Sequence, residues 1–141
     1  MGDILALATE HSDIAALLQA GEETAAAEGK PLRLMAVWPR SALRDDPGAL
    51  VERLFALAKE ARAELTVYYH DDAAEVAVRC AQRYGAARMV MEVPSESCGG
   101  GIVAAMRCAC PGIPIQFAGD NGTLGGYPSM MELARAVCVS A

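Results

Sequence analysis

The first strand–helix–strand unit is contained in residues 4–37, ILALATEHSDIAALLQAGEETAAAEGKPLRLMAV, and this stretch decides the fold. It opens with an apolar run at residues 4–8, which is too short for a helix and is typical of a strand buried on both faces. Ser12 or Asp13 can cap the amphipathic helix that follows, and Gly29 ends it. A second apolar run comes soon after this glycine. Two buried strands joined by one crossover helix pair in parallel.

The same alternation of apolar runs and amphipathic segments continues to residue 117. Further strands are predicted at 32–37, 65–69, 88–93 and 113–117, and further helices at about 50–61, 72–85 and 99–108, with a loop at 41–47. This pattern predicts a three-layer α/β/α fold with a five-stranded parallel sheet in the order 3-2-1-4-5. Beyond residue 119 the composition becomes polar and glycine-rich. We therefore expect one α/β domain at residues 1–119, followed by a linker and a C-terminal helix at 120–141.

The composition limits the classes of partner. The chain has 141 residues, enough for one domain, and its net charge of -6 argues against binding to nucleic acid or to an anionic membrane. No apolar stretch is long enough for a membrane span, and no positive region precedes the first apolar run as in a signal peptide. The 5 cysteines, an odd number, fit reduced thiols better than a disulfide framework. We therefore expect a cytoplasmic protein.

Several stretches of the chain resemble the universal stress proteins. They are residues 4–12, 28–32, 81–91, 100–103 and 110–115, and they follow one another in the family's order. The likeness covers residues 3–118 and is closest to the stress-protein-like domain of KdpD-type potassium sensors. It implies the fold of the adenine nucleotide alpha hydrolases and an adenine nucleotide, ATP or AMP, as ligand. It also implies a homodimer in which the last strand pairs across a two-fold axis.

The resemblance further implies a nucleotide site at the carboxyl ends of the strands. The family's nucleotide-binding members carry an acidic residue after the first strand, where this chain has Thr9. They also carry a glycine motif after the fourth strand, of which Gly100 or Gly101 is the counterpart here. The residues expected to contact a nucleotide are Ala8, Thr9, Val37, Met91, Ser95, Ser97, Gly99, Gly100 and Gly101. The phosphates would lie on the N–H groups of the three glycines, which open a helix, and the adenine between Val37 and Met91.

The other polar residues near the strand ends have two interpretations. Residues 9–12 could touch a ribose or a base, or they could simply cap the first helix. His11 and His70 both follow strands, so they can share one rim and do acid–base work. The segment from His70 to Asp72, however, is more typical of a turn and a helix cap than of an acid–base site. The glycine-rich loop is either a phosphate cradle or a flexible helix cap.

We expect the tryptophan and the cysteines to pack in the hydrophobic core. Trp38 could stack on a base, but packing in the core is the more typical role. Cys108 and Cys110 form a C-x-C pair without a second pair at zinc-binding spacing. We therefore predict no metal site, and we expect the cysteines to be reduced and buried.

The leading interpretation is a regulatory or stress-response module that binds an adenine nucleotide, or a degenerate form that has lost this ability. We do not expect an enzyme, because the sequence shows no nucleophile–base pair of recognisable spacing. Two alternatives stay open: a dimerisation or partner-docking module that binds no nucleotide, and a nucleotide hydrolase. A receiver domain has similar topology but needs a lysine after its last strand, where this chain has Gly119.

Overall fold

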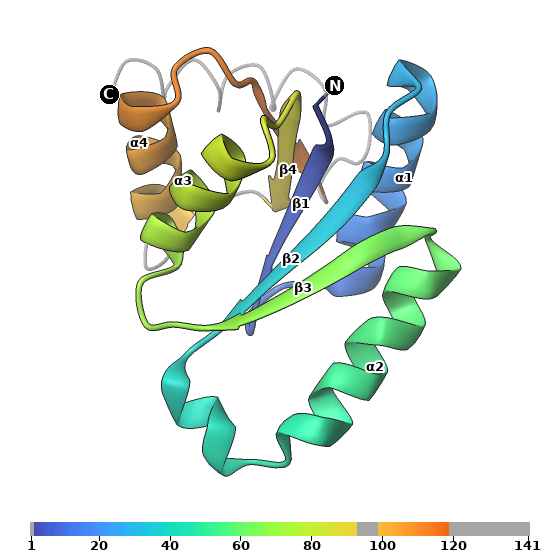
Figure 1. Ribbon diagram of the computed structural model, residues 1–141, viewed down its shortest axis with the longest axis vertical. Coiled ribbons are helices and arrows are strands. Elements are labelled where there is room, and N and C mark those ends of the chain that lie inside the picture. The colour runs from blue at the N-terminus through green and yellow to red at the C-terminus, as the bar shows by residue number, and fades with distance from the viewer. Residues whose placement is uncertain (1, 93–98, 119–141) are drawn as a thin grey trace.

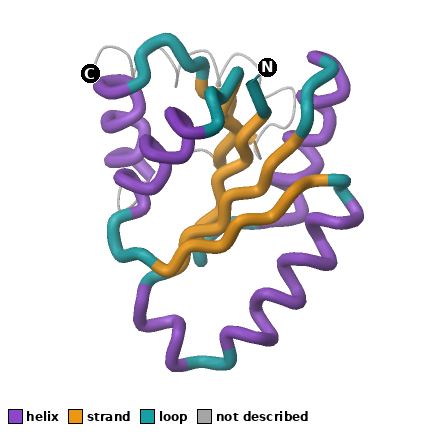
Figure 2. Tube along the Cα trace, in the orientation of Figure 1, coloured by secondary structure: helices purple, strands orange, loops and turns teal. Residues whose placement is uncertain are grey.

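Five strands and four α-helices alternate within the part of the chain that the structure describes (Figure 2). The computed structural model describes residues 2–92 and 99–118. The strands are β1 (Ile4–Thr9), β2 (Leu32–Trp38), β3 (Ala63–Tyr69), β4 (Arg88–Glu92) and β5 (Ile115–Ala118). The helices are α1 (Ile14–Glu28), α2 (Pro47–Glu60), α3 (Ala73–Arg83) and α4 (Gly99–Ala109), with a 3-10 helix η1 (Arg40–Arg44). No helix within the described residues is both long and apolar enough to cross a membrane.

The sheet is parallel throughout, with the strand order β3-β2-β1-β4-β5, which confirms the predicted topology. β1 pairs with β2 along its whole length, so that Thr9 lies beside Val37. Its pairing with β4 covers only three residues, from Ile4 to Ala6. The ladder between β1 and β4 therefore ends before the carboxyl ends of the two strands, at the point where the strand order reverses. In α/β sheets this is the position where ligands bind.

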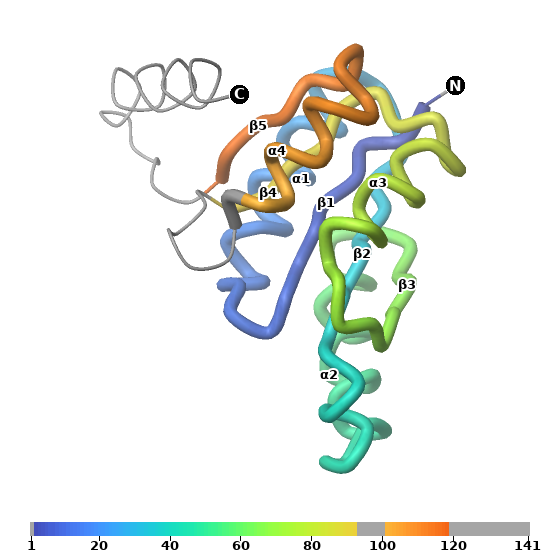
Figure 3. The backbone as a smooth tube through the Cα atoms, turned by 90° about the vertical axis from the view of Figure 1, so that its left-hand side faces the viewer, coloured from blue at the N-terminus to red at the C-terminus, as the bar shows by residue number. Residues whose placement is uncertain are grey.

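The sheet is covered on both faces. Figure 1 shows α1 and α2 on one side of the strands and α3 and α4 on the other. Alternate side chains of one strand enter different cores, because successive residues point to opposite faces. The η1 helix and the first turns of α2 extend past the carboxyl ends of the strands (Figure 3).

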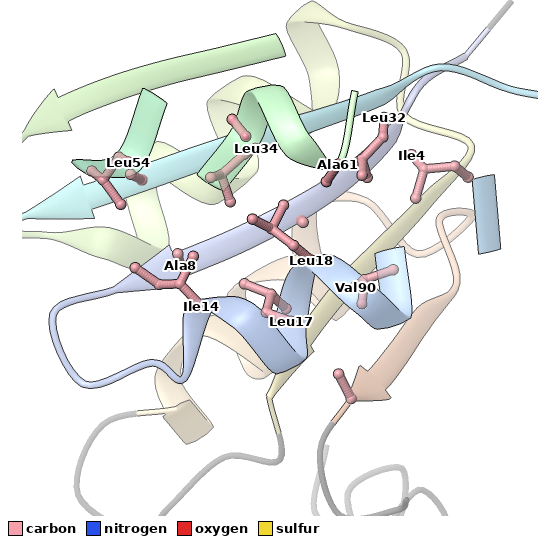
Figure 4. Close-up of a cluster of buried hydrophobic side chains, with 14 of the residues drawn as sticks. Ile4, Ala8, Ile14, Leu17, Leu18, Leu32, Leu34, Leu54, Ala61 and Val90 are labelled. Atoms are coloured by element: carbon pink, nitrogen blue, oxygen red, sulfur yellow. The ribbon is translucent and has the colours of Figure 1, made fainter. Parts of the chain in front are cut away.

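The first core lies between the sheet and the pair α1–α2 (Figure 4). Its fully buried side chains include Ile4, Ala6, Ala8, Leu17, Leu34, Leu54, Ala58 and Val90. The second core lies under α3 and α4 and includes Leu5, Leu7, Met35, Val37, Ala77, Ala81, Met89, Met91, Val103 and Met106. Trp38 belongs to the first core, as predicted, and is only 8% exposed.

The helix ends follow the sequence signals. The carboxylate of Asp13 caps α1 by accepting a hydrogen bond of 3.2 Å from the N–H of Ala16. Asp72 caps α3 in the same way. Gly29 ends α1 with a φ of 66°, a left-handed conformation that glycine adopts without a Cβ penalty.

Three segments differ from the sequence prediction. The expected loop at 41–47 contains η1 and the start of α2. β3 begins at Ala63, two residues earlier than predicted. β5 begins at Ile115 instead of 113, because Pro114 has no N–H to donate to the ladder. Val93, the loop with Ser95 and Ser97, and the predicted linker and helix at 120–141 lie outside the described residues.

Candidate functional site

A pocket of about 360 Å³ lies at the carboxyl ends of β1, β2 and β3, beside the first turn of α4. The residues that line it are Thr9, Glu10, His11, Val37, Pro39, His70, Asp71, Asp72, Ala73, Ala74, Gly101 and Ile102. Its volume is in the range of small-molecule sites, about 300–1,000 Å³. Four segments far apart in the sequence therefore meet at one edge of the sheet.

Local hydrogen bonds shape the β1 side of the pocket. The N–H of Thr9 donates to Ser12 Oγ at 2.9 Å, and the N–H of His11 donates to Thr9 Oγ1 at 3.3 Å. These bonds close a tight turn that ends at the cap residue of α1. The turn leaves the side chains of Glu10 and His11 exposed at the rim, and His11 Nε2 lies 3.6 Å from Glu10 Oε2.

The β3 side is built from the turn between β3 and α3. Asp71 Oδ1 accepts a hydrogen bond of 3.0 Å from the N–H of Arg40, which joins this turn to η1. His70 Nδ1 accepts a hydrogen bond of 2.9 Å from the N–H of Asp72. An accepting Nδ1 carries no proton, so neutral His70 holds its proton on Nε2, which lies 3.6 Å from Glu75 Oε1. The rim of the pocket is therefore held in place by backbone-to-side-chain bonds.

The lining combines apolar walls with acidic groups. Val37 and Ile102 are buried at 3% and 6% exposure, and Pro39 and two alanines widen the apolar part. Three of the lining side chains are carboxylates, and the described lining contains neither lysine nor arginine. The apolar walls suit a flat ring, whereas the carboxylates oppose a highly charged anion.

Glu92 lies at the same edge of the sheet as the pocket. It is the last residue of β4, and its Oε2 accepts a hydrogen bond of 2.9 Å from the backbone N–H of Asp13. The N–H of Asp13 lies at the start of α1, where the helix dipole favours a negative charge. The carboxylate of Glu92, and not that of a ligand, therefore occupies the N-terminus of α1.

The structure brings together only part of the predicted nucleotide site. Thr9, Val37 and Gly101 line the pocket. Ala8 does not, because its side chain is fully buried in the first core, on the face opposite to Val37. Met91 is buried in the second core and is not among the lining residues. Gly99 and Gly100 begin α4, and Ser95 and Ser97 lie outside the described residues.

The sequence interpretation placed His11 and His70 on one rim, and the pocket confirms this. Their imidazoles are 68% and 33% exposed, and each lies near a glutamate. The predicted nucleotide contacts did not include the turn after β3, Pro39, Ile102 or the nearby Glu92. Glu10 belongs to residues 9–12, which the sequence offered as possible contacts to a ribose or a base. The available signal was the position of the turn residues at the carboxyl end of a strand, where parallel sheets bind ligands.

A smaller cavity of about 180 Å³ lies between β3 and α3. The cavity contains Tyr68 and Cys80. Burial raises the pKa of the Cys80 thiol above its ordinary value. A hydrogen bond with Cys80, together with burial, raises the pKa of the Tyr68 phenol. Both groups therefore stay protonated near neutral pH, which makes Cys80 a poor nucleophile.

The cysteines only partly match their prediction. Cys80 and Cys110 are buried, but Cys108 is exposed, because it lies on the outer side of α4. Within residues 2–92 and 99–118, no three His, Cys, Asp or Glu side chains come together as a metal site would require.

Similarity to known proteins is found at the level of structure. No protein-family model and no curated protein matches the sequence. A protein from the universal stress protein family of Burkholderia pseudomallei superposes with a TM-score of 0.57 at 19% identity, over 82% of this chain and 94% of that chain. The universal stress protein of Archaeoglobus fulgidus gives a TM-score of 0.58 at 15% identity, over 84% and 93%. A universal stress protein in complex with cAMP gives 0.55 at 17% identity, over 83% and 98%.

These identities are low, so the agreement concerns the fold. The shared fold agrees with the strand order observed here and with the resemblance found in the sequence. The likeness to the KdpD-type domain stays a prediction. The chain therefore has the α/β fold of the universal stress proteins.

Proposed function

We propose that this chain is a regulatory or stress-response module that binds an adenine nucleotide in the pocket at the carboxyl edge of its sheet. The observation that carries the proposal is the pocket itself, because it lies where sheets of this type bind ligands. The universal stress protein solved in complex with cAMP supports it, since that protein shares the fold.

The lining suggests how the ligand lies. The adenine ring packs against Val37 and Ile102, which form the apolar wall. The phosphate lies toward Gly101, in the first turn of α4, where backbone N–H groups and the helix dipole favour an anion. Met91 contributes only to the core beneath. Binding covers the turns after β1 and β3, and thereby changes a surface that a partner reads.

The test is a substitution that fills the pocket without disturbing the fold. A Cβ added at Gly101 meets nothing within 4 Å, so Gly101→Val adds a branched side chain to open space in the pocket. We expect it to weaken AMP binding at least about tenfold in titration calorimetry. Gly112→Val is the matched control, because a Cβ at Gly112 also meets nothing within 4 Å and this residue does not line the pocket.

The outcomes separate the possibilities. Binding lost in Gly101→Val and kept in Gly112→Val supports the pocket as the site. Binding kept in both variants places the nucleotide elsewhere. No heat with AMP, ATP or cAMP at millimolar ligand contradicts nucleotide binding and leaves the docking-module alternative.

We also propose that the protein forms a cytoplasmic homodimer through β5 and catalyses no reaction. β5 is an edge strand, and exposed strand edges in proteins are usually covered. Light scattering at high micromolar concentration tests this proposal. A dimer that dissociates when Ile115 is replaced by proline supports pairing through β5, whereas a monomeric wild-type protein contradicts it.

A further inference from the structure

The charge of the pocket is one-sided. Glu10, Asp71 and Asp72 all line it, and the twelve described lining residues include neither lysine nor arginine. The two histidines are the other titratable groups of the lining. Sites that hold polyphosphates normally place lysine, arginine or a metal ion against the phosphate oxygens.

The bonds made by these carboxylates do not cancel their charges. Asp71 and Asp72 each accept a hydrogen bond from a neutral backbone N–H group, that of Arg40 and that of Glu75 respectively. Neither aspartate is in an ion pair with another described residue. Glu10 is 40% exposed, and among the described residues only the imidazole of His11 lies within ion-pair distance of it. The rim therefore keeps a negative potential in the absence of ligand.

The N-termini of α1, α3 and α4 at this edge are not equally available, because Asp72 already caps α3. Glu92 already accepts the N–H of Asp13 at the start of α1, so its carboxylate stands where a second phosphate group could otherwise bind. The segment that joins β4 to α4, residues 93–98, contains one glutamate and no basic residue in its sequence. Of these three helix starts, that of α4 is the one at which no carboxylate of the described residues accepts a hydrogen bond.

We infer that the pocket selects adenine ligands by charge: it accepts adenosine and the singly charged cAMP, and it rejects ATP. This inference rests on the proposed function and narrows it to a ligand class. Each added phosphate brings like charge close to the carboxylates, and the low dielectric of a pocket strengthens that repulsion. The apolar walls contribute equally to all three ligands, because these ligands share the same base.

Calorimetric titrations with adenosine, cAMP and ATP, with EDTA present to keep ATP free of Mg²⁺, test the inference. At about 0.02 M salt we expect adenosine and cAMP to bind within about threefold of each other. We expect ATP to bind at least about tenfold more weakly. At about 0.3 M salt the gap should narrow, because salt screens the repulsion. Exclusion of ATP by shape alone would not depend on salt.

Two variants that each remove one negative charge sharpen the test. Glu10→Gln removes an exposed charge that caps no helix, so the fold is preserved. Glu92→Gln keeps an oxygen for the Asp13 N–H and removes the charge. In each variant, the affinity for ATP should rise at least about threefold relative to the affinity for adenosine measured in the same variant. Glu23→Gln is the control, because Glu23 is exposed on α1 and does not line the pocket.

Each outcome has a distinct meaning. ATP that binds as tightly as adenosine overturns charge selection and leaves nucleotide binding intact. A gap that responds neither to salt nor to the two variants also overturns charge selection. Failure of all three ligands to bind overturns the proposed function and this inference together.

Discussion

The backbone N–H of Asp13 donates a hydrogen bond of 2.9 Å to Glu92 Oε2, although the two residues are 79 positions apart in the chain. The bond joins the start of α1 to the end of β4, at the edge where the ladder between β1 and β4 has already ended. A carboxylate at a helix N-terminus is stabilised by the unpaired N–H groups there. Glu92 thus joins β4 to α1 beyond the end of this ladder, next to the candidate site.

Removal of this carboxylate should destabilise the fold. We expect Glu92→Ala to lower the free energy of unfolding by about 1–2 kcal/mol, through loss of a charged acceptor at a helix end. Glu92→Gln should cost about half as much, because it keeps an acceptor oxygen. Urea unfolding measures both. Glu23→Ala, on the exposed side of α1, should change the free energy of unfolding by less than about 0.5 kcal/mol. Equal losses at the two positions would contradict a specific role for Glu92.

Arg33 lies between two acidic partners that should contribute unequally. Its guanidinium stacks over Tyr84 at 4.0 Å and pairs with Asp3 at 3.3 Å and with Glu64 at 3.0 Å. The Asp3 side chain is 23% exposed and that of Glu64 is 76% exposed. Solvent screening should therefore outweigh the shorter distance. We expect Asp3→Asn to cost about 1 kcal/mol and Glu64→Gln less than about 0.3 kcal/mol in urea unfolding. The reverse order would show that distance, and not burial, sets the strength of these pairs.

The cysteines should differ in reactivity in the folded protein. Cys80 is buried, and burial raises the pKa of its thiol, so little thiolate is present at pH 8. Cys108 is exposed on α4. Alkylation with iodoacetamide, followed by peptide mass spectrometry, should label Cys108 at least about tenfold faster than Cys80. Labelling of both at similar rates in urea is the control for intrinsic reactivity. Fast labelling of Cys80 in the native state would contradict its burial.

The same pKa shift makes the stability depend on pH in the alkaline range. The pKa of Cys80 is raised in the folded state above its ordinary value of 9.0, so the unfolded thiol loses its proton first. Stability is then fully present below about pH 9 and falls as the pH rises toward the folded-state pKa. One such group contributes at most about 1.4 kcal/mol per pH unit.

Urea unfolding of the wild type and of Cys80→Ser between pH 8 and pH 10.5 isolates this contribution. The variant should lose less stability with rising pH than the wild type does. Tyr68→Phe should also flatten the profile, but only above about pH 10, since the pKa of the Tyr68 phenol is raised from 10.0. Parallel profiles for the wild type and Cys80→Ser would contradict the shift.

The sequence by itself determined the elements and their order. Short apolar runs alternate with amphipathic segments, and this alternation predicts buried parallel strands with crossover helices. The sequence narrowed each cap to two neighbouring residues, Ser12 or Asp13 and Asp71 or Asp72, and it predicted Gly29 as a helix end, because such residues act on backbone groups a few residues away. The structure selects Asp13 and Asp72. The strand order and the predicted role of Trp38 in the core were also confirmed, because both follow from the hydrophobic pattern and the connectivity of the chain.

Only the tertiary structure decided which side chains meet at the site. Ala8 and Val37 lie near one another at the strand ends, but the register pairs Ala8 with Ala36, so Ala8 and Val37 face opposite cores. The contact of Asp13 with Glu92, and the meeting of His70 with the turn after β1, depend on how far the strands run and where the ladder stops. Such contacts join residues tens of positions apart, and local periodicity carries no information about them.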